Sequence, residues 1–244
     1  MNDFKQYNII FACAVLIYSQ PALSQQDFQF PQTIKYTISK NGGKTTEQSL
    51  FSYTKRGRYV GMINTSFRFI DQNYKNINEI YTYLLSLDYS YVSSIFIQNS
   101  KQKMEIKLIQ GKGLDGLEKK MLKFYSDKRS GFEPLCKKFD LIDLNSALIM
   151  ASHSTCMNTN LNDEFYYYSF TDKKIKFAHM RNIGNETMSI NGKVKKCNVF
   201  QIYPEKDKEI IDIYVYRDSA GYCIPAIITW KNLNISFTLS KIAY

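Results

Sequence analysis

The chain has 244 residues, of which 44% are hydrophobic and 22% charged, with a formal net charge of +10. This composition excludes a disordered or collagen-like chain, and no apolar run approaches the roughly 20 residues of a transmembrane helix. The 19 Tyr and 16 Phe, set against 11 Gly and 5 Pro, favour one ordered, aromatic-rich domain with many strands.

The first segment has the three-part layout of a secretory signal peptide. Lys5 precedes the apolar block 9–17, and the small-x-small site Ala22-Leu23-Ser24 follows it. We therefore predict a signal peptide over 1–24, cleavage between Ser24 and Gln25, one β-rich domain over 25–244, and a periplasmic or secreted location. A buried core segment and lipidation at Cys13 are the alternatives, and Phe11 is bulky where a lipidation site usually has a small residue.

Apolar alternation and β-rich runs predict about 11 or 12 strands joined mostly by short turns. Asn41-Gly42-Gly43 and Asn191-Gly192 are strong hairpin signals, because Asn and Gly tolerate positive φ. Short turns imply antiparallel neighbours. The predicted fold is therefore mainly β, one large curved antiparallel sheet resembling half a barrel. The predicted strands are 33–40, 50–55, 58–70, two runs within 79–98, 103–110, 164–170, 174–180, 186–190, 193–203, 209–217, 223–230 and 234–241.

Two short helices are predicted in the middle of the chain. The first spans 117–125, where Leu117, Met121, Leu122 and Tyr125 have helical spacing, and a charged loop over 126–134 follows. The second begins at Asp140 or Asp143 as N-cap and runs to about residue 152. Its apolar stripe consists of Leu144, Ala147, Leu148 and Ala151.

Removal of the signal peptide leaves four cysteines, Cys136, Cys156, Cys197 and Cys223. An even number in an exported chain predicts two disulfides. Local pairing is expected, Cys136 with Cys156 around the second helix and Cys197 with Cys223 in the C-terminal strands. A sequential meander conflicts with the latter bridge, because two strand spacings are about 9.5 Å and a disulfide needs Cα atoms within roughly 7 Å. Three outcomes then remain: the turn over 218–222 folds back over the middle strand, the strands are not in sequential order, or the cysteines pair otherwise.

No motif in the sequence supports an enzyme, a cofactor or a metal site. Gly111–Gly116 matches G-x-G-x-x-G, but the surrounding chain lacks the βαβ pattern of a dinucleotide site. His153 and Cys156 could form a nucleophile pair, which a disulfide at Cys156 would abolish. No C-x-x-C pair is present for zinc. We therefore predict a protein that is not an enzyme, with no cofactor and no metal.

The positive charge is carried mostly by scattered lysines, as in Lys119-Lys120, Lys173-Lys174 and Lys195-Lys196. Specific base readout usually uses Arg, so we expect no nucleic-acid partner. Solvated faces and protected sheet edges explain most of these lysines. A basic surface that docks on anionic lipid or on an acidic partner is the alternative.

Several predicted strands are apolar on both faces, including I-Y-T-Y-L-L and the F-Y-Y-Y of 165–168. A half-exposed sheet needs only one apolar face, so helices or a lipid-like ligand must cover the other. The candidate ligand-lining residues, in a pocket between sheet and helices, are Tyr81, Tyr83, Tyr89 and Phe96.

The stretches Asp143–Leu148, Tyr214–Asp218 and Ile224–Ile228 resemble secreted bacterial β-rich proteins of unknown function. That group is similar in outline to the periplasmic lipoprotein-carrier (LolA-like) superfamily, in which a curled antiparallel sheet holds acyl chains. The resemblance covers roughly 130–244. It implies a carrier of a hydrophobic ligand and transfers no ligand-contacting residue.

The sequence thus predicts an exported, soluble, non-enzymatic protein that binds a hydrophobic or lipid-like ligand in the periplasm. The alternative is an envelope assembly or adhesion module that binds a protein partner. A membrane barrel would need a repeated lipid-facing alternation, which the predicted helices and the four cysteines fit poorly. We therefore expect no membrane-spanning segment.

Overall fold

The computed structural model describes residues 30–40, 43–55, 62–70, 77–85, 91–112, 118–126, 130–134, 140–169, 174–204 and 210–244. The predicted signal peptide, the Ser24–Gln25 cleavage site, Tyr89, Cys136 and the Asn41-Gly42 turn lie outside these ranges.

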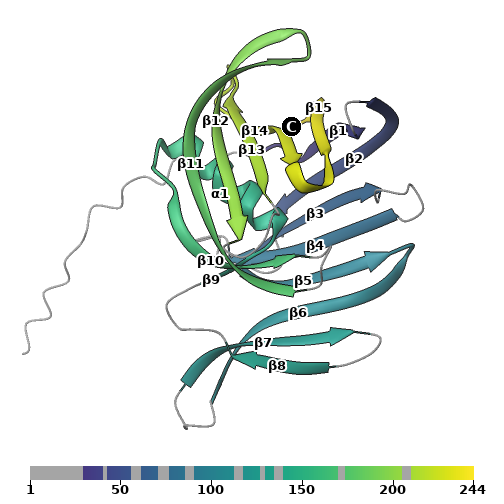
Figure 1. The fold of residues 1–244 in the computed structure, drawn as a ribbon, viewed down its shortest axis with the longest axis vertical. Coiled ribbons are helices and arrows are strands. Elements are labelled where there is room, and N and C mark those ends of the chain that lie inside the picture. The colour runs from purple at the N-terminus through teal and green to yellow at the C-terminus, as the bar shows by residue number, and fades with distance from the viewer. Residues whose placement is uncertain are drawn as a thin grey trace, which may run out of the picture.

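The described chain forms one 15-stranded sheet, and the fold is mainly β as predicted (Figure 1). The order of neighbouring strands is β8-β7-β6-β5-β4-β3-β2-β1-β15-β14-β13-β12-β11-β10-β9. All pairs are antiparallel except β9 with β10. The strands are β1 (Thr33–Lys40), β2 (Gly43–Lys55), β3 (Met62–Ile70), β4 (Ile77–Leu85), β5 (Tyr91–Gln98), β6 (Lys101–Lys112), β7 (Glu118–Ser126), β8 (Ser130–Pro134), β9 (Asp140–Ile142), β10 (Asn162–Ser169), β11 (Lys174–Ile190), β12 (Lys193–Pro204), β13 (Ile211–Arg217), β14 (Cys223–Trp230) and β15 (Ile235–Ala243).

The sheet grows outward in both directions from its middle, where the first strand β1 pairs with the last strand β15. The N-terminal half ends at edge strand β8 and the C-terminal half at edge strand β9. These two strands are consecutive in the chain, yet they are not sheet neighbours, and β9 instead approaches β5. The sheet is therefore strongly curved but not closed.

One α-helix, α1 (Leu144–Met157), lies inside the curved sheet and packs against β3, β4, β9, β13 and β14 (Figure 1). Asp143 is its N-cap and forms a capping box with Ser146, while Asn158 ends the helix in the left-handed conformation. The predicted stripe is buried, but so are Asn145, Ser146, Ile149, Ser152 and Ser154. Because its first turns, 144–149, are buried on every side, they must be enclosed by their surroundings, so side chains of α1 fill this part of the interior.

The first predicted helix and the charged loop after it are wrong. Residues 118–126 form β7, and Ser130–Pro134 form the edge strand β8. Along β7, Leu122 pairs with Leu108 and Phe124 with Ile106 of β6. Leu122 and Ile106 are almost fully buried. Pairing with β6 buries this face of β7, which outweighs the weak helical spacing of the segment. One further short helix, the 3₁₀ turn η1 (Lys231–Leu233), precedes β15.

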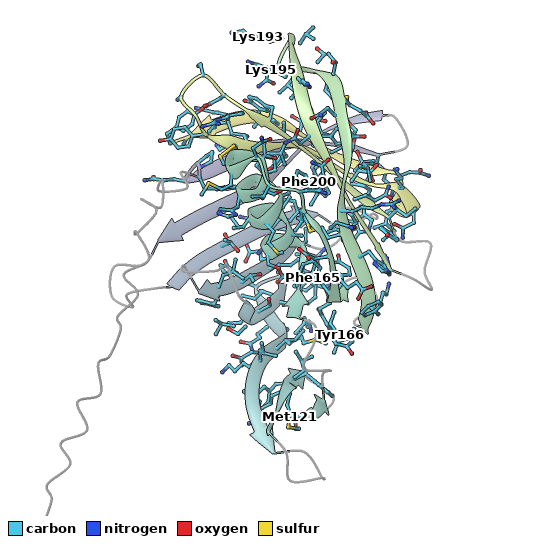
Figure 2. All side chains as sticks on the ribbon, turned by 90° about the vertical axis from the view of Figure 1, so that its left-hand side faces the viewer. Met121, Phe165, Tyr166, Lys193, Lys195 and Phe200 are labelled. Atoms are coloured by element: carbon cyan, nitrogen blue, oxygen red, sulfur yellow. A yellow bond between two sulfur atoms is a disulfide. The ribbon has the colours of Figure 1, made fainter. Side chains whose placement is uncertain are left out.

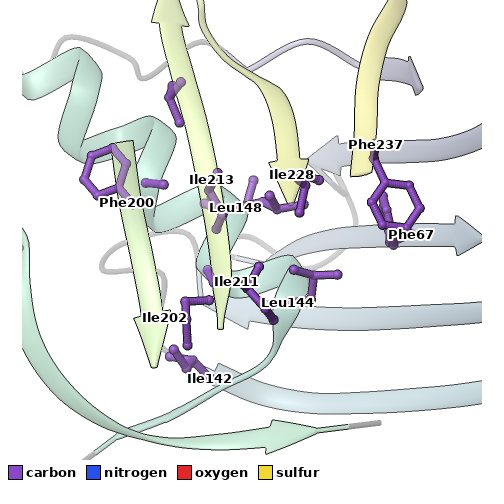
Figure 3. Close-up of a cluster of buried hydrophobic side chains, with 14 of the residues drawn as sticks. Phe67, Ile142, Leu144, Leu148, Phe200, Ile202, Ile211, Ile213, Ile228 and Phe237 are labelled. Carbon is purple, nitrogen blue, oxygen red and sulfur yellow. The ribbon is translucent and has the colours of Figure 1, made fainter. Parts of the chain in front are cut away.

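The main core lies between α1 and the strands on either side of it. Leu144 and Leu148 of the helix contact a layer that contains Ile202, Ile213 and Ile228 (Figure 3). Phe67 packs edge-to-face on Phe237, with ring centroids 5.3 Å apart. These contacts join the two halves of the sheet through the helix. They supply the dense apolar packing expected of a core.

A buried tyrosine holds the two halves together near the middle of the sheet. The hydroxyl of Tyr36 on β1 donates a 2.8 Å hydrogen bond to the carbonyl oxygen of Pro225 on β14. Burial raises the pKa of Tyr36. The phenol therefore stays a neutral donor, reaching across β15 to β14.

Candidate functional site

The sheet overlaps itself where β6 meets β10. Side chains alternate along β10, so Phe165 faces the interior with its cross-strand partner Ala178, and Tyr168 points to the outer face. Met104 lies on the interior face of β6, as does its partner Phe96 on β5. The Tyr168 hydroxyl contacts the sulfur of Met104. The inner face of β6 therefore lies on the outer face of β10, and the sheet is a spiral.

This contact joins two apolar surfaces that are only partly covered, which we call the overlap. Tyr166 stands two residues along β10 from Tyr168, and Ile175 is the cross-strand partner of Tyr168. Figure 2 shows Phe165 and Tyr166 between the helix and the strand that carries Met121. On the same two faces as Met104 and Tyr168, the partly buried apolar residues nearby along the strands are Leu108 and Phe124 on β6 and β7, and Tyr166 and Ile175 on β10 and β11, and we count them as part of the overlap.

Phe124 is positioned in the overlap by a glycine. Gly131 on edge strand β8 is its cross-strand partner. A Cβ atom added at Gly131 would lie 2.7 Å from Cζ of Phe124, so the ring covers the space that a larger residue would fill. The ring of Phe124 therefore lies over the backbone of Gly131, next to the free edge of the sheet.

A buried polar cluster fixes the start of α1 to the sheet beside the overlap. Asp143 Oδ2 accepts hydrogen bonds from Thr82 Oγ1 on β4 and Ser94 Oγ on β5, each 2.5 Å long. Its Oδ1 accepts from the backbone N–H of Ser146 at 2.9 Å. Asn145 Nδ2 donates to the carbonyl oxygen of Ile80 at 2.9 Å and to Thr82 Oγ1 at 3.0 Å.

All the side chains of this cluster are essentially excluded from solvent. Both oxygens of the carboxylate are used by donors of the protein itself, so neither is presented to a substrate. The cluster therefore positions β4 and β5 relative to α1, and through β5 it positions the neighbouring strand β6.

The predicted ligand-lining residues do not share one surface. Phe96 is buried on the interior face beside the overlap. Tyr81 and Tyr83 point to the outer face of β4, because Thr82 between them points inward. The Tyr81 hydroxyl donates to Glu79, which also pairs with Arg68. These two tyrosines thus lie on the outer face of β4 and do not line the interior with Phe96. Tyr89 lies outside the described residues.

Sequence reasoning missed the residues of the overlap. Tyr166 and Tyr168 belong to the F-Y-Y-Y run whose two apolar faces are visible in the sequence. At Tyr168 the second face is covered by Met104 of β6, a strand of the same sheet. No local pattern could indicate this, since 64 residues separate Tyr168 from Met104.

The local disulfide pairing is wrong. Cys156 at the end of α1 bonds to Cys223 at the start of β14, with their Cα atoms 5.6 Å apart. β12, β13 and β14 are sequential neighbours, which places a whole strand between Cys197 and Cys223, as the meander argument required. Cys197 is a free, buried thiol, and burial raises its pKa to about 11. Cys136 lies outside the described residues.

The other motifs considered in the sequence are structural in this fold. Gly111 on β6 pairs with Lys119 on β7, so the glycine motif leads to an antiparallel strand and not to a helix. His153 lies on α1, where burial lowers its pKa, and the sulfur of Cys156 is in the disulfide. His179 stacks on Tyr203 with centroids 4.9 Å apart.

Within the described residues, no three His, Cys, Asp or Glu side chains are grouped so that they could hold a metal ion. None of the helices in those ranges has the length and apolar character of a membrane span.

Comparisons with known proteins indicate a fold but no family. No protein-family model matches the chain, and no curated protein matches it. A solved structure of a beta-barrel-like protein of domain of unknown function DUF1849 from Brucella abortus is similar. The TM-score is 0.53 at 10% identity, over 88% of this chain and 98% of that one. A DUF1329 family protein from Desulfovibrio piger aligns over 88% and 86% of the two chains at 11% identity. Its TM-score of 0.21 is too low to indicate a shared fold.

The first comparison confirms the coarse part of the resemblance, a strand-rich, barrel-like fold found in a protein of unknown function. The likeness to lipoprotein carriers, the periplasmic location and the absence of enzymatic activity stay predictions.

Proposed function

We propose that this chain is an exported, non-enzymatic protein that holds a hydrophobic, lipid-like ligand in the overlap. The observation that carries the proposal is that both layers present apolar side chains which the fold leaves partly exposed, Leu108 and Phe124 on one layer and Tyr166 and Ile175 on the other. Apolar surface between two layers favours an apolar occupant, since removing it from water contributes about 25 cal/mol per Å².

The pocket expected between sheet and helix is not part of this proposal, because residues 144–149 of α1 are buried on every side and fill that space. An overlap near a free sheet edge also offers a route for entry. The edge strand β8 has only five residues and pairs on one side, with β7. Small displacements of a free edge cost less than opening a strand in the middle of a sheet.

Native mass spectrometry of the protein isolated from its own cells tests the proposal first. We expect an added mass that corresponds to a lipid and that organic solvent removes. A fluorescent C18 fatty acid then gives the affinity of the delipidated chain by titration.

A pair of adjacent residues on β7 provides a matched comparison. Phe124→Asp introduces a charge on the inner face, whereas Tyr125→Asp introduces the same charge on the outer face, where Tyr125 is already 36% exposed. We expect at least a tenfold loss of fatty-acid affinity for the first variant and little change for the second. Equal affinities, with both variants folded by circular dichroism, would exclude the overlap as the site. A stable protein partner without any lipid mass would favour the assembly-module alternative.

A further inference from the structure

A second surface lies at the other end of the molecule, on the hairpin formed by β11 and β12 (Figure 1). β12 pairs with β13 only from Asn198 onward, so residues 193–197 pair with β11 alone. At about 3.3 Å per residue, these five residues extend the hairpin by about 16 Å. Asn191 and Gly192 form its turn, with φ values of 50° and 73°, which confirms the predicted hairpin signal.

The two faces of the hairpin differ. On one face, Ile190 and Cys197 are buried, and Lys195 Nζ lies 5.4 Å from the ring centroid of Tyr216. At Ile190 and Cys197 this face packs on the body of the protein, and it also carries the acidic residue of the hairpin, Glu186, which pairs with Cys197 and is exposed. The hairpin is therefore held in place along one side.

The opposite face is exposed and carries no acidic residue. Its side chains are small and polar, Asn185, Thr187 and Ser189, apart from Val194 and Lys196. Val194 is 74% exposed, although a valine gains by leaving water. Lys196 shares this face with Val194, whereas Lys193 is the first residue of β12 after the turn and pairs with Ile190 on the other face; both lysines are exposed. Neither lysine forms an ion pair with any residue that the structure describes. Figure 2 shows Lys193 and Lys195 at this end of the molecule.

We infer that the hairpin tip docks on an anionic phospholipid surface, with Val194 inserted at the interface, Lys196 beside it on the same face, and Lys193 reaching the headgroups from the turn. A narrow convex tip with small neighbouring side chains fits a flat surface better than it fits a pocket in a protein. The charge is complementary to anionic lipid, and a lysine near such a surface strengthens binding about fivefold. The inference is independent of the ligand proposed for the overlap.

Vesicle co-sedimentation of the full chain tests the inference. We expect binding to vesicles of 30% phosphatidylglycerol in phosphatidylcholine, no binding to pure phosphatidylcholine, and weaker binding as NaCl rises from 50 to 300 mM. Lys193→Gln combined with Lys196→Gln should weaken binding about 25-fold. The matched control is Lys35→Gln with Lys241→Gln, which removes the same charge from an exposed cross-strand pair on β1 and β15.

The control decides whether the hairpin tip or the overall positive charge is responsible for binding to anionic vesicles. Equal losses of vesicle binding in the two double variants would overturn the inference. So would a chain that binds polyglutamate beads but does not bind anionic vesicles. Val194→Trp adds a direct readout. With the emission of the buried Trp230 subtracted by use of the natural chain, its fluorescence should shift to shorter wavelength on anionic vesicles, whereas that of Tyr125→Trp at the opposite end should not shift. An unshifted tip tryptophan would show that the hairpin does not insert.

Discussion

Asp143 joins three parts of the molecule through one side chain. It caps α1, and its carboxylate accepts from Thr82 on β4 and Ser94 on β5. Truncation would remove the cap and leave two buried hydroxyls without their acceptor, each costing about 1–3 kcal/mol. We expect Asp143→Ala to lower the free energy of unfolding by about 3 kcal/mol or more, measured by urea denaturation.

Asp143→Asn is the conservative control for this prediction. An amide keeps the shape of the side chain and one acceptor oxygen for the cap, and the two hydroxyls can turn to accept from the new NH₂ group. Asp143→Asn should therefore lower the free energy of unfolding by less, about 1 kcal/mol. If Asp143→Ala unfolded at the same urea concentration as the natural chain, the cluster would not be what fixes the helix to the sheet.

The disulfide acts at the scale of the element, because it ties the last turn of α1 to the first residue of β14. It closes a loop with a sequence separation of 67 residues. A loop of that length restricts the unfolded chain by about 4 kcal/mol in the chain-entropy model. We expect Cys156→Ser with Cys223→Ser to lower the free energy of unfolding by about 3–4 kcal/mol.

A reductant separates this effect from the substitutions themselves. Dithiothreitol should destabilise the natural chain by a similar amount and leave the double variant unchanged. Non-reducing peptide mapping should recover one linked pair, Cys156 with Cys223. Recovery of Cys197 linked to Cys223 would contradict the structure.

A comparison of the helices and strands with the sequence shows which local signals were sufficient to predict them. β1 and β14 occupy the predicted ranges, since their apolar alternation or β-rich composition is strong and local. α1 was predicted because Asp143 and the apolar stripe mark its start and its inner face. β7 was not predicted as a strand, since the spacing of Leu117, Met121 and Leu122 in the sequence is compatible with a helix. Pairing with β6 is what makes residues 118–126 a strand.

The candidate site depends on relations that no local pattern contains. Cys156 and Cys223 come from elements that meet only when the sheet curves around α1. Tyr168 and Met104 meet only when the sheet passes over itself. The two apolar faces of β10 were visible in the sequence and did indicate that something covers the second face. The identity of that cover follows from the curvature of the whole sheet.

At the scale of the molecule, the spiral divides the sheet into an enclosed part and an overhanging part. β13 and β14 have a strand on each side and α1 packed against them. β8 is an edge strand, and the inner face of β6 and β7 is only partly covered at Met104, Leu108 and Phe124. Strands with fewer buried contacts open more readily, so the overhang should open without unfolding of the enclosed part.

Amide hydrogen exchange should resolve these two parts. We expect amides of β7 and β8 to exchange at least 100-fold faster than those of β13 and β14, because local opening of the overhang costs less than global unfolding. A bound fatty acid should slow exchange in β6, β7, β10 and β11 and leave β13 and β14 unchanged, since it would contact both layers of the overlap. The Phe124→Asp variant should keep the difference between the two parts and lose the response to fatty acid. Uniform protection along the whole sheet would instead mean that the spiral opens as one cooperative unit, with no separate overhang to admit a ligand.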